Sequence, residues 1–432
     1  MDEPSPRPDG AGPAPRPSPP AAAGPAPLAR RLGVGDAVVI GLGSMLGAGV
    51  FAAFAPAAEV AGAGLLLGLA VAAAYCNATS SARLAALYPR SGGTYVYGRE
   101  RLGEFWGHLA GWSFVVGKTA SCAAVALTVG YHTAPGLARP IAVAAVAGVT
   151  ALDHCGVHRS ARATRLVVGV VLAVLATVVV AGWAGGHPRA AQLSPSTGHG
   201  ITGVLQAAGF LFFAFAGYAR IATLGEEVRD PARTIRRAIP LALGITLVVY
   251  AALAVVVLAV LGPDGTAGTS APLVAVVQAT PWDWLAPVVR AGAAVAALGS
   301  LLALVLGVSR TAFAMARDRH LPGLLDAVHP RHGVPHRATL AVGVVVTAVV
   351  LVADVRGAIG FSSVAVLAYY AIANASALTL GRDRGTRLVP VLGLIGCLVV
   401  AVSLPPASTV GGCAVLAAGP LVWTVRRRWR PR

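Results

Sequence analysis

The stretch Gly35–Phe54, GDAVVIGLGSMLGAGVFAAF, is apolar enough to enter a bilayer but is interrupted by Gly41, Gly43, Gly47 and Gly49. Each glycine costs roughly 1 kcal/mol relative to alanine in a helix interior, so the pattern predicts a broken helix. In hydrocarbon, unwound backbone is tolerated only where it lines a polar cavity or is buried in protein. The stretch therefore predicts a membrane-embedded binding site. The alternative is that the glycines only let two helices approach closely.

The composition predicts a single membrane domain. The chain has 432 residues, of which 56% are hydrophobic and 12% charged, and its apolar runs repeatedly exceed the ~20 residues that span a bilayer. We expect an all-α polytopic membrane protein over residues 31–432, without room for a soluble catalytic domain. Residues 1–30 are rich in proline, alanine and glycine and predict a disordered cytoplasmic tail.

About twelve membrane spans are expected after this tail. They lie near residues 35–58, 62–87, 104–130, 139–155, 163–183, 200–224, 238–262, 284–315, 338–353, 357–380, 388–404 and 408–425. The net charge of +17 comes from arginines that gather beside alternate connections, which is the pattern of cytoplasmic loops rather than of a nucleic-acid-binding surface. This alternation predicts an even number of spans, both termini in the cytoplasm and a plasma-membrane location.

A second interrupted helix is predicted in the sixth span. Its sequence, GFLFFAFAGYARIATLGEE from Gly209 to Glu227, places Gly217 and Arg220 in an aromatic-rich apolar segment. Two interrupted helices five spans apart are what a 5+5 inverted repeat predicts, with the substrate held between the two breaks. The repeats would cover residues 35–183 and 200–380.

Four motifs resemble those of the amino acid, polyamine and organocation superfamily of permeases. They are GLGSMLGAGVF in the first span, YPRSGGTYVY before the third, FAFAGYARIATLGEEVRDPARTIRRAIP in and after the sixth, and SRTAFAMARDRHLPGLLDAVHPRHGVP in and after the eighth. The resemblance implies a leucine-transporter-like fold with broken helices 1 and 6. Two accessory helices at residues 388–425 would follow the two repeats.

The resemblance also implies a substrate site at the two breaks. The freed amides of the first break would receive a substrate carboxylate; they lie around Ser44, Met45, Gly47, Ala48 and Gly49. Carbonyl groups near Phe215, Ala216 and Gly217 would receive the substrate ammonium group. Phe215 and Tyr218 would flank the substrate or gate the site, with ordinary core packing as the alternative.

Two residues are candidates for ion coupling. Lys118 is the only lysine and lies within an apolar segment, where a charge costs about 3 kcal/mol or more, so we expect it to face the bundle interior and to exchange protons. The alternatives are hydrogen bonds to backbone carbonyls or a position nearer the membrane boundary. Ser300, in the middle of the eighth span, is a weaker candidate for a sodium site. Ala219 stands where many relatives have a glutamate, which weakens the case for cationic substrates.

Other polar clusters do not indicate catalysis or a cofactor. The sequence from Glu226 to Pro231 is interpreted as a salt-bridged hinge at a helix end. The histidines in the loop after the eighth span lack metal-ligand spacing; they are His320, His329, His332 and His336. Five scattered cysteines are expected to be small core residues. We therefore expect neither an enzyme, nor a metal site, nor a cofactor.

Together these features predict a secondary transporter in the lipid bilayer that moves amino acids or related small amines by alternating access. Protons, sodium and exchange stay open as the means of coupling, and Lys118 is the best titratable candidate for a proton. An exchanger of an amine against its precursor, and a sensor that binds the same ligand without translocating it, are the alternatives. The particular substrate, the coupling and the direction of transport stay open.

Overall fold

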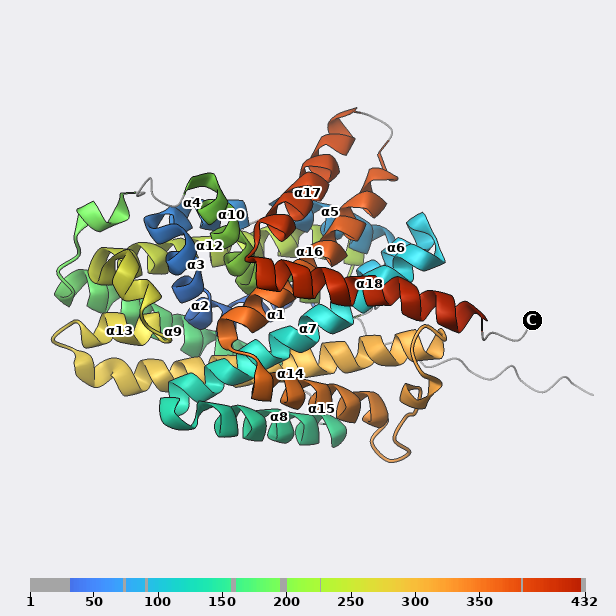
Figure 1. The fold of residues 1–432 in the computed structure, drawn as a ribbon, viewed down its shortest axis with the longest axis horizontal. Coiled ribbons are helices and arrows are strands. Elements are labelled where there is room, and N and C mark those ends of the chain that lie inside the picture. Colours follow the sequence, from blue (N-terminus) through green and yellow to red (C-terminus); the bar gives the residue numbers. More distant parts are fainter. Residues whose placement is uncertain are drawn as a thin grey trace, which may run out of the picture.

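The computed structural model describes residues 32–72, 75–89, 92–156, 161–194, 200–225, 227–381 and 384–428. The predicted tail at residues 1–30 lies outside this part of the chain. Within it the regular elements are helices, which form a single bundle (Figure 1). The bundle confirms the prediction of an all-α polytopic protein.

Eleven helical segments of the described residues are long and apolar enough to cross a membrane. A further apolar helix, α15 (His336–Val352), has 17 residues and a length of about 25 Å, which is slightly short for a span. It occupies the position of the ninth predicted span. The segments agree with the predicted spans from the third onward, while the first two spans are divided differently.

The first predicted span consists of three helical pieces. Helix α1 (Val34–Met45) ends at the glycine-rich centre, α2 (Ala48–Ala52) begins after Gly47, and α3 (Phe54–Ala61) follows. The second predicted span contains η1 (Gly62–Gly64), α4 (Leu65–Ala72) and α5 (Tyr75–Leu87). The predicted interruption of the first helix is therefore present between Met45 and Ala48.

The second interruption is a tightening of the helix rather than a gap. Helix α10 (Gly200–Phe215) passes into the 3-10 turn η5 (Ala216–Tyr218) and then into the short helix α11 (Ala219–Ala222). Helix α1 packs against η5 and α11, so the two interrupted helices are neighbours in space although they are far apart in the sequence.

The remaining helices surround this pair. They are α6 (Thr94–Leu102), α7 (Glu104–Thr133), α8 (Ala138–His154), α9 (Ala161–Gly185), α12 (Pro231–Ala267), α13 (Pro272–Gln278), α14 (Ala286–Arg317), α16 (Val355–Leu378), α17 (Arg384–Ser403) and α18 (Pro406–Arg428). The short helices α6 and α13 were not predicted, because each lies in a connection between spans.

Burial separates a central set of helices from a peripheral one. The apolar windows of α7 and α16 are each 83% buried inside the protein, whereas those at the C-terminus, within α17 and α18, are 22% and 17% buried. In Figure 1, α7 runs alongside α14, and α17 and α18 lie at the outside of the bundle. Most of the surface of helices α17 and α18 is therefore not covered by the rest of the chain.

The N-terminal end of α1 is joined to the loop between α11 and α12. Leu32 N–H donates to the Glu227 carbonyl at 3.1 Å, and Arg229 N–H donates to the Leu32 carbonyl at 2.9 Å. These two bonds form an isolated parallel bridge between Leu32 and Val228. Asp36, in the first turn of α1, also forms an ion pair with Arg165 of α9.

Candidate functional site

The two interrupted helices meet through backbone atoms, with glycines at the points of contact. A Cβ atom on Gly217 would lie 2.8 Å from the Met45 nitrogen, and one on Gly49 would lie 2.6 Å from the Ala214 Cα. Cβ atoms do not approach other atoms this closely, so any side chain at either position would push the two helices apart. Close approach of the helices, which was left open as an alternative role for the glycines, therefore applies at both positions.

The hydroxyl of Tyr250 joins the two interruptions. This fully buried tyrosine of α12 donates to the Met45 carbonyl at 2.5 Å and lies 3.4 Å from the Ala214 carbonyl. Its ring packs against Phe215, with 5.0 Å between the ring centroids. Because carbonyl groups at helix ends lack partners within the helix, Tyr250 supplies a hydrogen bond that the break would otherwise lack. Sequence reasoning missed this residue, whose one signal is that it is the only aromatic residue in α12.

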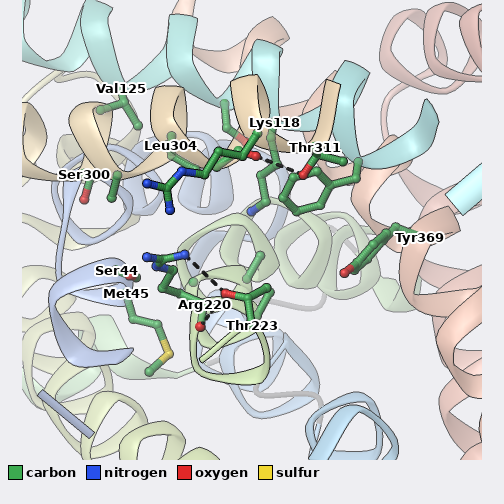
Figure 2. A pocket seen from close by; sticks show the side chains of 18 of the residues that line it. Ser44, Met45, Lys118, Val125, Arg220, Thr223, Ser300, Leu304, Thr311 and Tyr369 are labelled. Atoms are coloured by element: carbon green, nitrogen blue, oxygen red, sulfur yellow. Dashed lines mark hydrogen bonds between the residues drawn. The ribbon is translucent and has the colours of Figure 1, made fainter. Parts of the chain in front are cut away.

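A cavity of about 270 Å³ lies beside the two interruptions. Lys118 and Arg220 approach it from opposite sides, and Ser44 lies near Arg220 (Figure 2). The further lining residues come mainly from α7, α14 and α16 and include Phe114, Ser121, Ser300, Arg310, Thr311 and Tyr369. The cavity thus combines backbone of both interrupted helices with cationic, hydroxyl and aromatic side chains.

Most of the predicted substrate-binding residues line this cavity. They are Ser44, Met45, Ala48, Gly49, Ala216 and Gly217. The lining residues do not include Gly47, whose hydrogen atoms face the side chain of Ser300. Phe215 and Tyr218 are also outside the lining; both are fully buried and pack against Tyr250 and Tyr370. Core packing therefore describes the positions of these two aromatic residues.

Both predicted coupling residues lie on the same cavity. Lys118 and Ser300 are each 6% exposed, and they come from α7 and α14. In the described part of the chain Lys118 has no ion pair, and the hydroxyl of Ser300 has no hydrogen-bond partner. The alternative role considered for Lys118 was a hydrogen bond to a backbone carbonyl. No such bond is present in the described part of the chain.

Two arginines on the cavity were not predicted as site residues. Arg220 follows the second interruption and donates to the Thr223 hydroxyl at 3.3 Å. Arg310 lies in α14, within the predicted eighth span at residues 284–315. Glu227 contributes a carboxylate to the cavity wall. The sequence could not place Arg310 on the cavity, because the side of the helix that faces the cavity is unknown before the helices are assembled.

A polar network closes the wall formed by α6. The Tyr95 hydroxyl donates to Asp318 at 2.6 Å, and Arg99 forms an ion pair with the same carboxylate at 2.8 Å. Burial, followed by the hydrogen bond to Asp318, raises the pKa of Tyr95, so its hydroxyl stays protonated and acts as a donor. His320 is buried and contacts Tyr95 and Glu104, which gives this histidine a structural role.

The predicted salt-bridged hinge after α11 lies only partly within the described residues. Glu226 lies outside the described residues, and no ion pair of the described residues involves Glu227, Arg229 or Asp230. Asp230 instead caps α12, where its side chain accepts a hydrogen bond from the Arg233 amide at 3.4 Å. A short aspartate before a proline favours this capping role.

Comparison with known proteins places the chain among transporters. The profile of the amino acid permease family matches residues 32–422. An uncharacterized transporter of Mycobacterium tuberculosis is 66% identical over 407 residues, which cover 93% of this chain and 92% of the relative. The branched-chain amino acid permease of Bacillus subtilis is 25% identical over 420 residues, covering 89% and 90%. The methylthioribose transporter of the same bacterium is 27% identical over 436 residues, covering 93% and 94%.

The Tyr250 hydrogen bonds generate a prediction about stability. Tyr250→Phe keeps the ring but leaves the buried Met45 carbonyl without this donor, so we expect the free energy of unfolding to fall by about 1–3 kcal/mol. Thermal unfolding of the purified protein in detergent should show a lower Tm. Tyr75→Phe, at a position that is 62% exposed, is the control and should leave Tm unchanged. Equal Tm values for the two variants would contradict the role of Tyr250.

Proposed function

The chain belongs to the amino acid permease family, and from this premise we propose that it moves amino acids or related small amines across the plasma membrane by alternating access. The observation that carries the proposal is the cavity between the two interrupted helices. Helix interruptions at membrane depth expose backbone hydrogen-bonding groups, which suit the charged ends of an amino acid.

In the proposed complex, the backbone at the breaks binds the substrate. The first amides of α2 have no partners within the helix, and Ala48 and Gly49 lie on the cavity, so they would donate to a carboxylate. The carbonyl of Ala216 would accept from the substrate ammonium group. Glycine at positions 49 and 217 would keep both stretches of backbone accessible as well as close together.

Alternating access would use two inverted repeats, at residues 35–183 and 200–380. Each repeat begins with an interrupted helix, and movement of one repeat against the other would open the cavity to either side in turn. Helices α17 and α18 would be accessory, in agreement with their low burial. Lys118 would carry a proton during this cycle, and Ser300 is the position at which sodium would act instead.

Counterflow tests transport directly. Proteoliposomes that contain the protein are preloaded with an unlabelled amino acid that the protein binds, and the same amino acid is added outside in labelled form. We expect the label to accumulate transiently inside. Liposomes without protein provide the baseline. Binding of the amino acid without any accumulation of label would indicate a sensor and would contradict the transporter mechanism.

Membrane orientation can be tested with cysteines in a Cys155→Ser and Cys413→Ser background, since both native cysteines are exposed. The arginine distribution predicts that Ala190→Cys, in the loop after α9, reacts with an impermeant maleimide in intact cells. Leu324→Cys, in the 67% exposed position between α14 and α15, should react only after permeabilisation. The opposite labelling pattern would reverse the proposed topology.

The proton-coupling role of Lys118 predicts a selective defect. Lys118→Met keeps much of the apolar stem but removes the charge, so the variant should retain substrate binding and exchange while losing uptake driven by a pH gradient. Ser300→Ala should respond differently, because it removes a candidate sodium ligand: it should lower only sodium-dependent uptake. Wild-type levels of pH-driven uptake in Lys118→Met would assign the coupling elsewhere.

A further inference from the structure

The cavity carries an excess of positive charge. Among the described lining residues, Lys118, Arg220 and Arg310 are cationic, while Glu227 is the one carboxylate. Arginine stays protonated in proteins, so the two guanidinium groups outnumber this carboxylate even when Lys118 is neutral. The excess does not depend on the proton that Lys118 is proposed to carry.

These arginines are not neutralised by ion pairs in the described part of the chain. The four ion pairs found there involve other residues, and Arg220 has a side-chain hydrogen bond only to Thr223. Because Arg220, Arg310 and Glu227 line the same cavity, the two guanidinium groups repel one another and attract the carboxylate. Arg220 is only partly exposed, so water compensates its charge less than that of the exposed Arg310, and a bound carboxylate would compensate it further.

The remaining polar groups of the cavity suit an anion better than a cation. The hydroxyl of Ser300 has no hydrogen-bond partner among the described residues and can donate to a carboxylate, whereas the hydroxyls of Ser44 and Thr311 already donate to backbone carbonyls. Each guanidinium group offers five N–H donors in a planar fork that matches a carboxylate in a bidentate arrangement.

We propose that the substrate is an acidic amino acid, whose side-chain carboxylate is bound by Arg220 and Arg310. This inference rests on the proposed function, in which the backbone of the two interruptions binds the α-carboxylate and the α-ammonium group. The second carboxylate then compensates the excess charge of the cavity. A cationic side chain in the same place would be repelled by both arginines, and a neutral amide would lack the charge-assisted hydrogen bonds.

Paired ligands that differ only in charge test the proposal. Binding to the purified full-length protein is measured by calorimetry for glutamate and glutamine, which are nearly isosteric, and for aspartate and asparagine. Leucine, lysine and inorganic phosphate complete the panel. We expect each acid to bind at least about tenfold more tightly than its amide, because hydrogen bonds between charged groups are the stronger ones.

Variants of the two arginines test whether these residues cause the tighter binding of acids. Arg310→Gln and Arg220→Gln should each weaken glutamate binding by about tenfold to a hundredfold while changing glutamine binding little. Arg317→Gln is the matched control on the same helix, since Arg317 is outside the cavity lining and packs over the Phe313 ring. It should leave glutamate binding unchanged. If Arg220→Gln does not fold, Arg310→Gln, at an exposed position, still provides the test.

The outcomes separate the inference from the proposed function. Tight binding of glutamine or leucine without binding of glutamate would overturn the acidic substrate while leaving amino acid transport intact. Phosphate that competes as well as glutamate would show a general anion site and would also overturn it. Equal losses in Arg310→Gln and Arg317→Gln would contradict a local role of Arg310. Absence of binding by every amino acid would contradict the proposed function, and this inference with it.

Discussion

The structure depends on hydrogen bonding of the backbone at the two helix interruptions. In a bilayer, a carbonyl that leaves a helix needs another donor, and here the hydroxyl of Tyr250 reaches Met45 in one interrupted helix and approaches Ala214 in the other. The same contact holds α12 against both helices. The glycines complete the arrangement, because a Cβ atom at Gly49 or Gly217 would separate the two stretches of backbone. The Met45 carbonyl beside the cavity is therefore paired, while the first amides of α2 have no partners within the helix.

Local patterns in the sequence predicted the positions of the interruptions and most of the spans. Clustered glycines in an apolar run and an abrupt Arg220 are unfavourable in an ordinary membrane helix, so they indicate a break without knowledge of the neighbours. Phe215 and Tyr218 could not be assigned in this way, because an aromatic residue at an interruption fits a cavity wall or a core equally well. In the structure both side chains are buried and pack against Tyr250 and Tyr370.

Contacts between distant segments could not be predicted from the sequence. Tyr250 lies more than thirty residues from Ala214 and about two hundred from Met45, so neither hydrogen bond has a local pattern. To predict the position of Arg310, one would need to know the rotation of α14 about its axis. This rotation places the arginine on the cavity with Ser300 and Thr311. Because the positive charge of a site is the sum over several helices, the charge of the cavity emerges only when the helices are assembled.

The bridge between Leu32 and Val228 has a mechanical consequence. Its two backbone bonds join the start of α1 to the segment that leads into α12, while Gly217 and Tyr250 join the same helices farther along. Two helices that are joined at two separated points can neither slide past one another nor change the angle between them easily. Helix α1 and the end of the second interrupted helix should therefore move together as one rigid unit, with a hinge at Leu46 and Gly47.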